Sequence, residues 1–291
     1  MREEAKAQLN MMLLFLISNL LALALLPVYQ IYSGGLGEAG NNPWTPIYYL
    51  IYIIIVTAII LIIAKLGKKG LLKAIFYFAI AWAMWYALFP FFFYFGIPFS
   101  DFISLGLAIA LTIWMLKNPE WYVMDLVGIL VTVGIALIFG LSLSLIPAVV
   151  LLSAFAIYDA IAVHFTKHMI TLADSVIEEK LPAMFVLPAK RDYSFKRAKG
   201  IKSTKTGGKE KEAYYMGFGD VLIPGVLVIS SAHNLNLIAG VFVLAGSLLT
   251  MLLLIEMVNK GKPQPGLPFL NAGALAGLLF YLLLRQSLYL C

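Results

Sequence analysis

Met216-Gly217-Phe218-Gly219-Asp220-Val221-Leu222-Ile223-Pro224-Gly225 is an apolar stretch that contains one carboxylate, with glycines before it and a proline after it. A charged side chain inside a membrane-grade helix costs about 2.5–3.5 kcal/mol on insertion scales, so a carboxylate in this position indicates a functional site. A second carboxylate, Asp159, lies in the similar run Phe155-Ala156-Ile157-Tyr158-Asp159-Ala160. We interpret the rest of the chain as the scaffold that brings these two aspartates together.

The composition places this scaffold in a membrane. Of the 291 residues, 62% are hydrophobic and 12% are charged, whereas soluble domains have about 25% charged residues. Apolar runs of about 18 or more residues recur along the chain, which predicts an all-α, polytopic membrane protein with a single membrane domain over residues 1–291. A membrane β-barrel is excluded, because barrel strands alternate apolar and polar residues.

We expect nine transmembrane helices, at about 9–32, 46–64, 71–96, 99–116, 121–141, 144–170, 216–234, 237–258 and, after Pro268, to about Leu290. A polar loop, 171–215, separates the sixth span from the seventh, and its apolar piece 181–188 is too short to cross a membrane. The first five spans (1–143) form an N-terminal scaffold, and the last four (144–291) carry both aspartates. Gly273 and Gly277 form a small-xxx-small pair, which predicts close helix packing in the last span.

The basic residues predict the orientation of these spans. With nine spans, 20 of the 21 Lys and Arg residues fall on one side of the membrane, and only Arg285 falls on the other. The positive-inside rule makes the richer side cytoplasmic. The N-terminus and the 171–215 loop are therefore expected in the cytoplasm, and the C-terminus outside. The net charge of +6 follows from this topology and does not predict nucleic-acid binding.

Metal and disulfide chemistry find little support in the sequence. Cys291 is the only cysteine, so no disulfide within the chain is possible. His164 and His168 have a spacing that zinc sites use, but no Glu lies between them, and histidines at a helix end are the preferred interpretation. We expect neither a metal nor a cofactor.

Asp159 and Asp220 fall in the cytoplasmic halves of consecutive, antiparallel spans. Their depths from the cytoplasmic helix ends are about 16 and 8 Å at 1.5 Å per residue. Two carboxylates a few ångström apart in a low dielectric share one proton, so one can activate water while the other protonates a carbonyl or a leaving amine. Gly217 and Gly219 are expected to supply backbone freedom and room for a substrate strand. Two alternatives stay open: a proton relay in a transporter or ion-leak channel, and buried polar residues bonded to neighbouring helices.

The chain resembles the presenilin and signal peptide peptidase family. Three short stretches are similar to that family's YD, GxGD and PAL motifs, and they fall in the sixth, seventh and ninth of nine spans, which is the family's order: Tyr158-Asp159, Gly217-Phe218-Gly219-Asp220 and Pro265-Gly266-Leu267. The resemblance covers at least residues 150 to the end. It implies a presenilin-like fold for the nine spans, with 144–291 as the catalytic part.

The resemblance also implies an activity. Asp159 and Asp220 would be the catalytic dyad of an intramembrane aspartyl protease, which hydrolyses peptide bonds within transmembrane helices of membrane proteins or signal peptides. The stretch 265–267 would lie beside the dyad and help to shape the active site or hold substrate, and Tyr158 would orient Asp159, contact substrate or simply pack. Gly266 stands where the family usually has Ala; the side chain remains small, so its role is expected to survive.

The sequence has features of both branches of the family. Residues 219–225 and 182–188 look like signal peptide peptidase, whereas Leu267-Pro268 and the orientation derived from the charges look like presenilin. Because the charge argument uses the whole chain, we favour a microbial presenilin homologue. Its compact loops suggest one polypeptide in the lipid bilayer without obligate partner subunits, and a homo-oligomer stays open.

Overall fold

The structure is a computed structural model that describes residues 2–31, 44–67, 69–161, 176–177, 179–190, 192–198, 212–259 and 265–289. The elements in these ranges are α1 (Arg2–Gln30), α2 (Thr45–Lys65), α3 (Lys69–Tyr94), α4 (Ser100–Lys117), α5 (Trp121–Ser142), α6 (Leu145–Ile161), β1 (Met184–Pro188), the short 3₁₀ helix η4 (Phe195–Arg197), β2 (Ala213–Gly217), α9 (Phe218–Asn234), α10 (Leu237–Asn259) and α11 (Gly266–Tyr289). His164, His168 and Cys291 lie outside the described residues.

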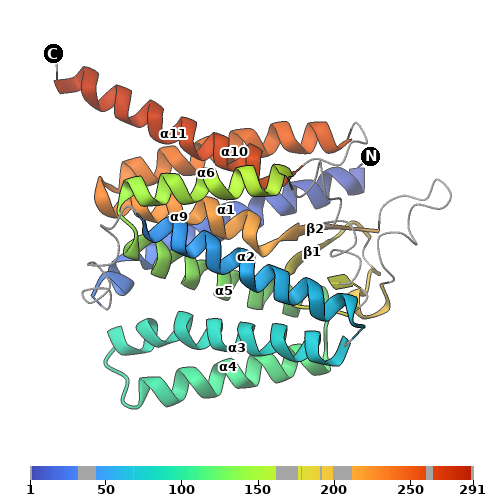
Figure 1. The fold of residues 1–291 in the computed structure, drawn as a ribbon. Helices are drawn as coiled ribbons and strands as arrows, with labels where there is room; N and C mark the ends of the chain where they lie inside the picture. Colours follow the sequence, from blue (N-terminus) through green and yellow to red (C-terminus); the bar gives the residue numbers. More distant parts are fainter. Residues whose placement is uncertain are drawn as a thin grey trace.

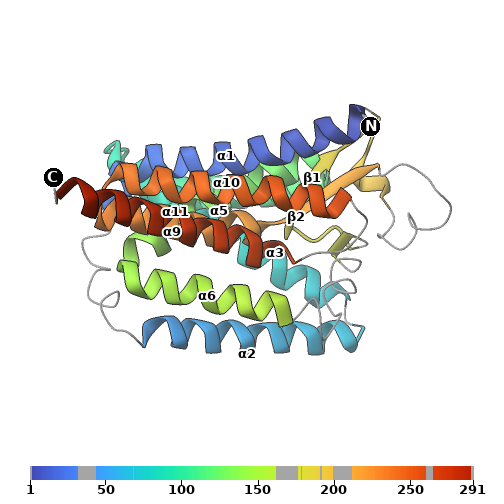
Figure 2. The ribbon, with the colours of Figure 1, turned by 90° about the horizontal axis from the view of Figure 1, so that it is seen from above.

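The helices form one bundle whose long axes run in roughly the same direction (Figures 1 and 2). In Figure 1, α3 and α4 lie along one edge of the bundle, and α10 and α11 lie along the opposite edge. α5 packs against α1, α3, α9 and β1. It is also the most buried of the long apolar helices, with 61% of its apolar segment buried against 28% for α3 and α4. The helix that packs beside the strands is thus a central support of the fold.

The expected spans agree with the observed helices. Each of the nine predicted spans coincides with one α-helix of the described residues, and six helices are long and apolar enough to cross a membrane by length and composition: α1, α3, α4, α5, α10 and α11. The first helix begins earlier than predicted, at Arg2, because the charged residues before the apolar run are good helix formers. The predicted sixth span extends to 170, and its last nine residues lie outside the described part.

A two-stranded antiparallel sheet is the main addition to the helical prediction. β1 pairs with β2 so that Val186 lies opposite Tyr215 and Met184 opposite Gly217. The apolar piece that is too short to span the membrane is therefore largely a strand. The prediction that the seventh span begins at Met216 is wrong by two residues, because Met216 and Gly217 end β2 and the helix begins at Phe218. The helix that carries Asp220 thus emerges directly from the sheet.

Glycines allow α10 and α11 to pack backbone against backbone. A Cβ atom on Gly273 would overlap the Gly246 carbonyl oxygen and the Thr250 hydroxyl, and one on Gly277 would overlap the Phe242 carbonyl oxygen. In a bilayer, helices associate through such close packing because burial of apolar surface gives no advantage over lipid. The predicted small-xxx-small contact is confirmed, and it fixes the position of α11.

Replacing Gly273 by Ala is expected to destabilise the fold. The added methyl group has no space at the α10–α11 contact, and overpacking costs about 1–3 kcal/mol. Thermal unfolding in detergent should show a lower Tm. Gly106→Ala on α4 is the matched control, because a Cβ there meets no atom within 4 Å; equal Tm values for the two variants would contradict the packing account.

Candidate active site

Asp159 lies on α6 and is buried, with 2% of its surface exposed. One carboxylate oxygen, Oδ2, accepts a hydrogen bond of 3.2 Å from the backbone N–H of Leu267. Leu267 is the second residue of α11, and N–H groups in the first turn of a helix have no partner within the helix. The buried carboxylate and the start of α11 therefore supply each other's missing hydrogen-bond partner.

Asp220 is the third residue of α9, and its position follows from the way in which that helix begins. Its Oδ2 atom accepts a hydrogen bond of 3.2 Å from the backbone N–H of Gly217, the residue that precedes the helix. An acidic residue in the third helical position commonly closes the N-terminus in this way, and the helix dipole favours its negative charge. Gly217 and Asp220 are thus spaced so that the hydrogen bond at the N-terminus of α9 holds the carboxylate in place.

The first residues of α11 bring the two carboxylates together. Leu267 donates to Asp159, and a Cβ atom on the neighbouring Gly266 would lie 3.1 Å from Oδ1 of Asp220. Two carboxylates, each with one backbone N–H donor, thus meet at the start of α11. Such a pair can divide general-acid and general-base roles between its members.

The other residues predicted for the site take different positions. Pro265 is buried immediately before α11, and Tyr158 is half-buried on α6 beside Asp159; the predicted roles of both stay predictions. The Phe218 ring packs edge-on against Phe185 of β1, with ring centroids 4.7 Å apart. Phe218 therefore attaches the start of α9 to the sheet.

The two glycines beside Phe218 do not use the conformational freedom that the sequence suggested. Gly217 has φ −61° and ψ 144°, an extended conformation that any residue adopts, and Gly219 lies within α9. A Cβ atom on Gly217 would lie 3.4 Å from Oδ2 of Asp220, and one on Gly219 would meet only Ile223 at 3.9 Å. Both distances are ordinary van der Waals contacts, so the visible contribution of Gly217 is the backbone N–H group that donates to Asp220.

A cavity of about 170 Å³ opens beside Asp220. Its walls combine residues from five elements, among them Met11, Tyr214, Met216, Met251, Leu254 and Leu270. β2 borders the cavity, and one of its edges faces away from β1. The carboxylate thus faces a mostly apolar space that is bordered by a strand. The sequence does not predict this cavity, because its lining residues come from distant segments. Their apolar side chains cannot be told apart in the sequence from the other apolar side chains of the spans.

Tyr215 adds a polar but uncharged group to this wall. Its hydroxyl group and that of Tyr193 form a hydrogen bond of 2.8 Å. Burial raises the pKa of both tyrosines above the ordinary value, so both hydroxyl groups remain protonated at working pH. Asp220 is the only carboxylate among the described residues that line the cavity.

Among the described residues, no three His, Cys, Asp or Glu side chains gather as they do in a metal site. The two carboxylates, their backbone donors and the cavity are suited to acid–base chemistry on a neutral group.

Comparison with known proteins identifies relatives over almost the whole chain. Residues 12–286 match the family described as signal-peptide peptidase, presenilin aspartyl protease. A solved structure of a presenilin family intramembrane aspartate protease in space group C222 is similar, with a TM-score of 0.69, 30% sequence identity, and 94% of this chain and 97% of that chain covered. A second structure so described, in space group P2, gives a TM-score of 0.68, 30% identity and coverage of 95% and 97%. No match was found among curated proteins.

Proposed function

The chain belongs to the signal-peptide peptidase and presenilin family of aspartyl proteases, and we propose that Asp159 and Asp220 are its two catalytic carboxylates. The protein is a multi-pass membrane protein and an intramembrane aspartyl protease. The comparisons do not support the alternative of a proton-coupled transporter.

One observation carries the assignment of the dyad. Two consecutive residues at the start of α11 contact the two carboxylates: the Leu267 N–H group donates to Asp159, and Gly266 lies against Asp220. A pair of merely structural aspartates on α6 and α9 would have no need of a third helix start between them. The Pro265-Gly266-Leu267 stretch thereby acts as a spacer that fixes the distance between the two acids.

The proposed reaction needs only this pair and one water molecule. The ionised carboxylate takes a proton from water, whose oxygen attacks the carbonyl carbon of the scissile peptide bond, while the protonated carboxylate gives its proton to the carbonyl oxygen. When the tetrahedral intermediate collapses, the C–N bond breaks, the leaving nitrogen receives a proton from one carboxyl group, and a hydroxyl group of the intermediate returns a proton to the other carboxylate. The two acids titrate as a coupled pair, so the roles belong to the pair.

The substrate is a transmembrane segment that must unwind before it can react. In a helix, each backbone carbonyl group is bonded within the helix, and lipid offers no replacement partner. The outer edge of β2, beside the cavity, can take up an extended chain as a further strand. The apolar walls at Met11, Met251 and Leu254 suit the side chains of such a segment.

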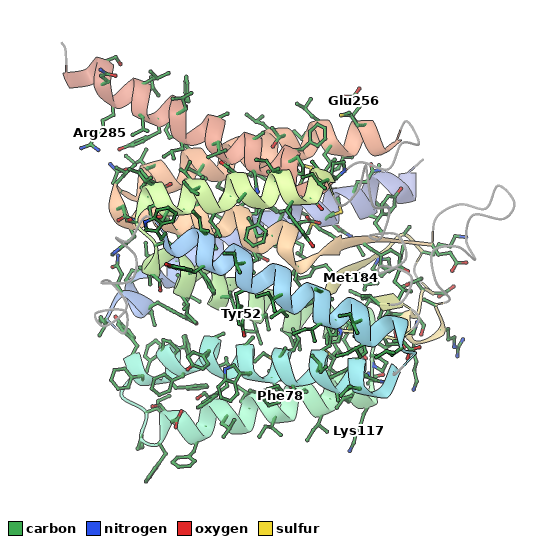
Figure 3. The ribbon with its side chains drawn as sticks, viewed as in Figure 1. Tyr52, Phe78, Lys117, Met184, Glu256 and Arg285 are labelled. Atoms are coloured by element: carbon green, nitrogen blue, oxygen red, sulfur yellow. The ribbon has the colours of Figure 1, made fainter. Side chains whose placement is uncertain are left out.

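We place the N-terminus and the 171–215 loop in the cytoplasm and the C-terminus outside. α1 begins at the end of the bundle where the strands lie, whereas α11 ends at the opposite end (Figure 1). Lys117 lies at the strand end and Arg285 at the opposite end (Figure 3), as the positive-inside rule requires for this orientation. The dyad then works in the cytoplasmic half of the bilayer.

We also propose that one chain, as a single membrane domain (1–291), forms the complete active site without obligate partner subunits. Both carboxylates, their backbone donors and the cavity come from the same polypeptide. The scaffold 1–143 contributes to the site through Met11 of α1 and through the packing of α5 on α9. We assign the chain to the presenilin-like branch on its orientation, and homo-oligomers are compatible with this account.

Cleavage of an apolar transmembrane peptide tests the function. The purified protein in detergent should convert the peptide into two fragments whose masses add up to that of the peptide plus one water. A peptide mimic with a hydroxyl group in place of the scissile carbonyl should inhibit the reaction. Absence of cleavage, together with dissipation of a pH gradient in liposomes that depends on Asp159 and Asp220, would instead support transport.

Substitution of Gly266 tests whether residue 266 must be small because it lies against the Asp220 carboxylate. A methyl group on Gly266→Ala lies 3.1 Å from Oδ1, so the carboxylate must shift by a few tenths of an ångström. Because a displacement of 1 Å can cost about 10²-fold in rate, we expect Gly266→Ala to cleave within about tenfold of the unchanged enzyme and Gly266→Val to lose at least about 10²-fold. Initial rates per folded enzyme measure this, and full activity of the valine variant would refute the close fit.

A further inference from the structure

A third carboxylate, Asp125, contacts the sheet at β1. It lies on α5, and its Oδ1 atom accepts a hydrogen bond of 2.8 Å from the backbone N–H of Val186 in β1. Val186 is fully buried. A buried backbone N–H group without a partner is costly, and a carboxylate is a strong acceptor. Asp125 therefore supplies a partner that the sheet itself lacks at this point.

The direction of this hydrogen bond explains its value to the fold. The sheet of the described residues has two strands, so each strand has one edge that faces its partner and one outer edge. The Val186 N–H group points to α5, away from β2. Asp125 thereby attaches the outer edge of β1 to α5, while residues of β2 line the cavity.

Gly128 makes a second contact on the same face of α5, one turn after Asp125. A Cβ atom on Gly128 would lie 2.5 Å from the Phe218 ring and 2.6 Å from the Phe185 ring. Residues three apart share one side of a helix. α5 thus offers a hydrogen-bond acceptor to β1 at Asp125 and, at Gly128, room for the packed rings of Phe185 and Phe218. Phe218 is the first residue of α9, two residues before Asp220.

A continuous path joins these contacts to the dyad. Phe218 donates its backbone N–H to the Ala183 carbonyl oxygen over 3.1 Å, and Phe218 begins the helix in which Asp220 is the third residue. Asp159, by contrast, is held by α6 and the start of α11. A movement of β1 on α5 would therefore act directly on the start of α9 and on Asp220, and would reach Asp159 only through the start of α11.

We infer that Asp125 is a positioning residue for proteolysis. It holds β1 on α5 and thereby sets the position of Asp220 and of the outer edge of β2, where the substrate is proposed to bind. The inference rests on the proposed function. According to this inference, α5 helps to determine which peptide bond of the substrate lies beside the dyad. Loss of the Asp125 acceptor should lower the rate and also spread the cleavage over neighbouring peptide bonds.

Cleavage positions separate positioning from simple stabilisation. A variant with less folded protein makes fewer products, but their ratios stay unchanged. Asp125→Leu removes the acceptor at similar volume, whereas Asp125→Asn keeps an oxygen that accepts from Val186. Asp101→Leu is the control, because Asp101 is exposed on α4 and accepts from Trp85 rather than from the sheet.

The experiment measures fragment masses and turnover per folded enzyme on one transmembrane peptide that the unchanged enzyme cleaves. We expect Asp125→Leu to lose about tenfold in kcat and to cut at several adjacent bonds, and Asp125→Asn and Asp101→Leu to keep the original pattern. Unchanged product ratios in folded Asp125→Leu, or a spread pattern in Asp125→Asn, would overturn the inference.

A second variant keeps the test open if Asp125→Leu does not fold. Gly128→Ala pushes the Phe185 and Phe218 rings away from α5 by a single methyl group and should spread the cleavage positions in the same way; an unchanged pattern would overturn the inference. If the unchanged enzyme cleaves no peptide, it is the proposed function that fails, so the two failures are distinguishable.

Discussion

Asp159→Asn and Asp220→Asn should each lose at least about 10³-fold in the rate of peptide cleavage, because general acid–base catalysis contributes about 10²–10⁴-fold and neither acid can replace the other. An asparagine cannot take a proton from water or give one to a carbonyl oxygen. Its side-chain oxygen still accepts a hydrogen bond, so the donors at Leu267 and Gly217 keep their partners. Initial rates and Tm of the purified variants, measured in the same detergent, check this expectation.

The control for the dyad is Asp101→Asn, which makes the same chemical change at an exposed carboxylate on α4. It should cleave at the unchanged rate. Cleavage that persists in either dyad variant while the Asp101→Asn protein behaves normally would rule out a mechanism with two aspartates. A loss of rate accompanied by unfolding would be visible in the Tm and would not count as support.

Leu267→Pro should lower kcat by at least about 10-fold, because it removes the N–H group that donates to Asp159, and a hydrogen bond to a charged group contributes about 1.5–3 kcal/mol. Proline is tolerated in the first turn of a helix, where the lost N–H has no partner within the helix. The substitution therefore deletes this hydrogen bond but none within α11, and because the proline Cδ atom takes the place of the amide hydrogen, the Asp159 carboxylate must also move away. Steady-state kinetics with the transmembrane peptide measure the effect.

Leu267→Ala separates the backbone group from the side chain. It retains the N–H donor and removes most of a side chain that is only 8% exposed. We expect it to lower the Tm and to retain most of the kcat. Equal kcat values for the proline and alanine variants would show that the Leu267 N–H group does not tune the dyad.

The features that the sequence predicts well are those with a strong physical signal. Apolar runs long enough to cross a bilayer predict nine helices, and all nine have a counterpart in the described residues. Asp159 and Asp220 stand out because a charge within such a run is costly. The proximity of the two carboxylates follows from the antiparallel arrangement of consecutive spans.

Other features arise only when distant segments meet. β1 and β2 have five residues each, and 24 residues separate Pro188 from Ala213, so no tight turn marks them as partners. Asp125 lies near the start of its span, where a carboxylate is unremarkable until Val186 is seen to point at it. The sequence shows that residue 266 is small, but the reason, a carboxylate oxygen of Asp220 that would lie 3.1 Å from an added methyl group, needs the folded chain.

An experimental structure of the unchanged enzyme with the hydroxyl-bearing peptide mimic tests the central claim most directly. We predict that the hydroxyl group lies within hydrogen-bond distance of both Asp159 and Asp220, with the peptide extended along the outer edge of β2. A mimic that contacts only one of the carboxylates, or that binds away from the start of α11, would contradict the assignment of these two residues as the catalytic pair.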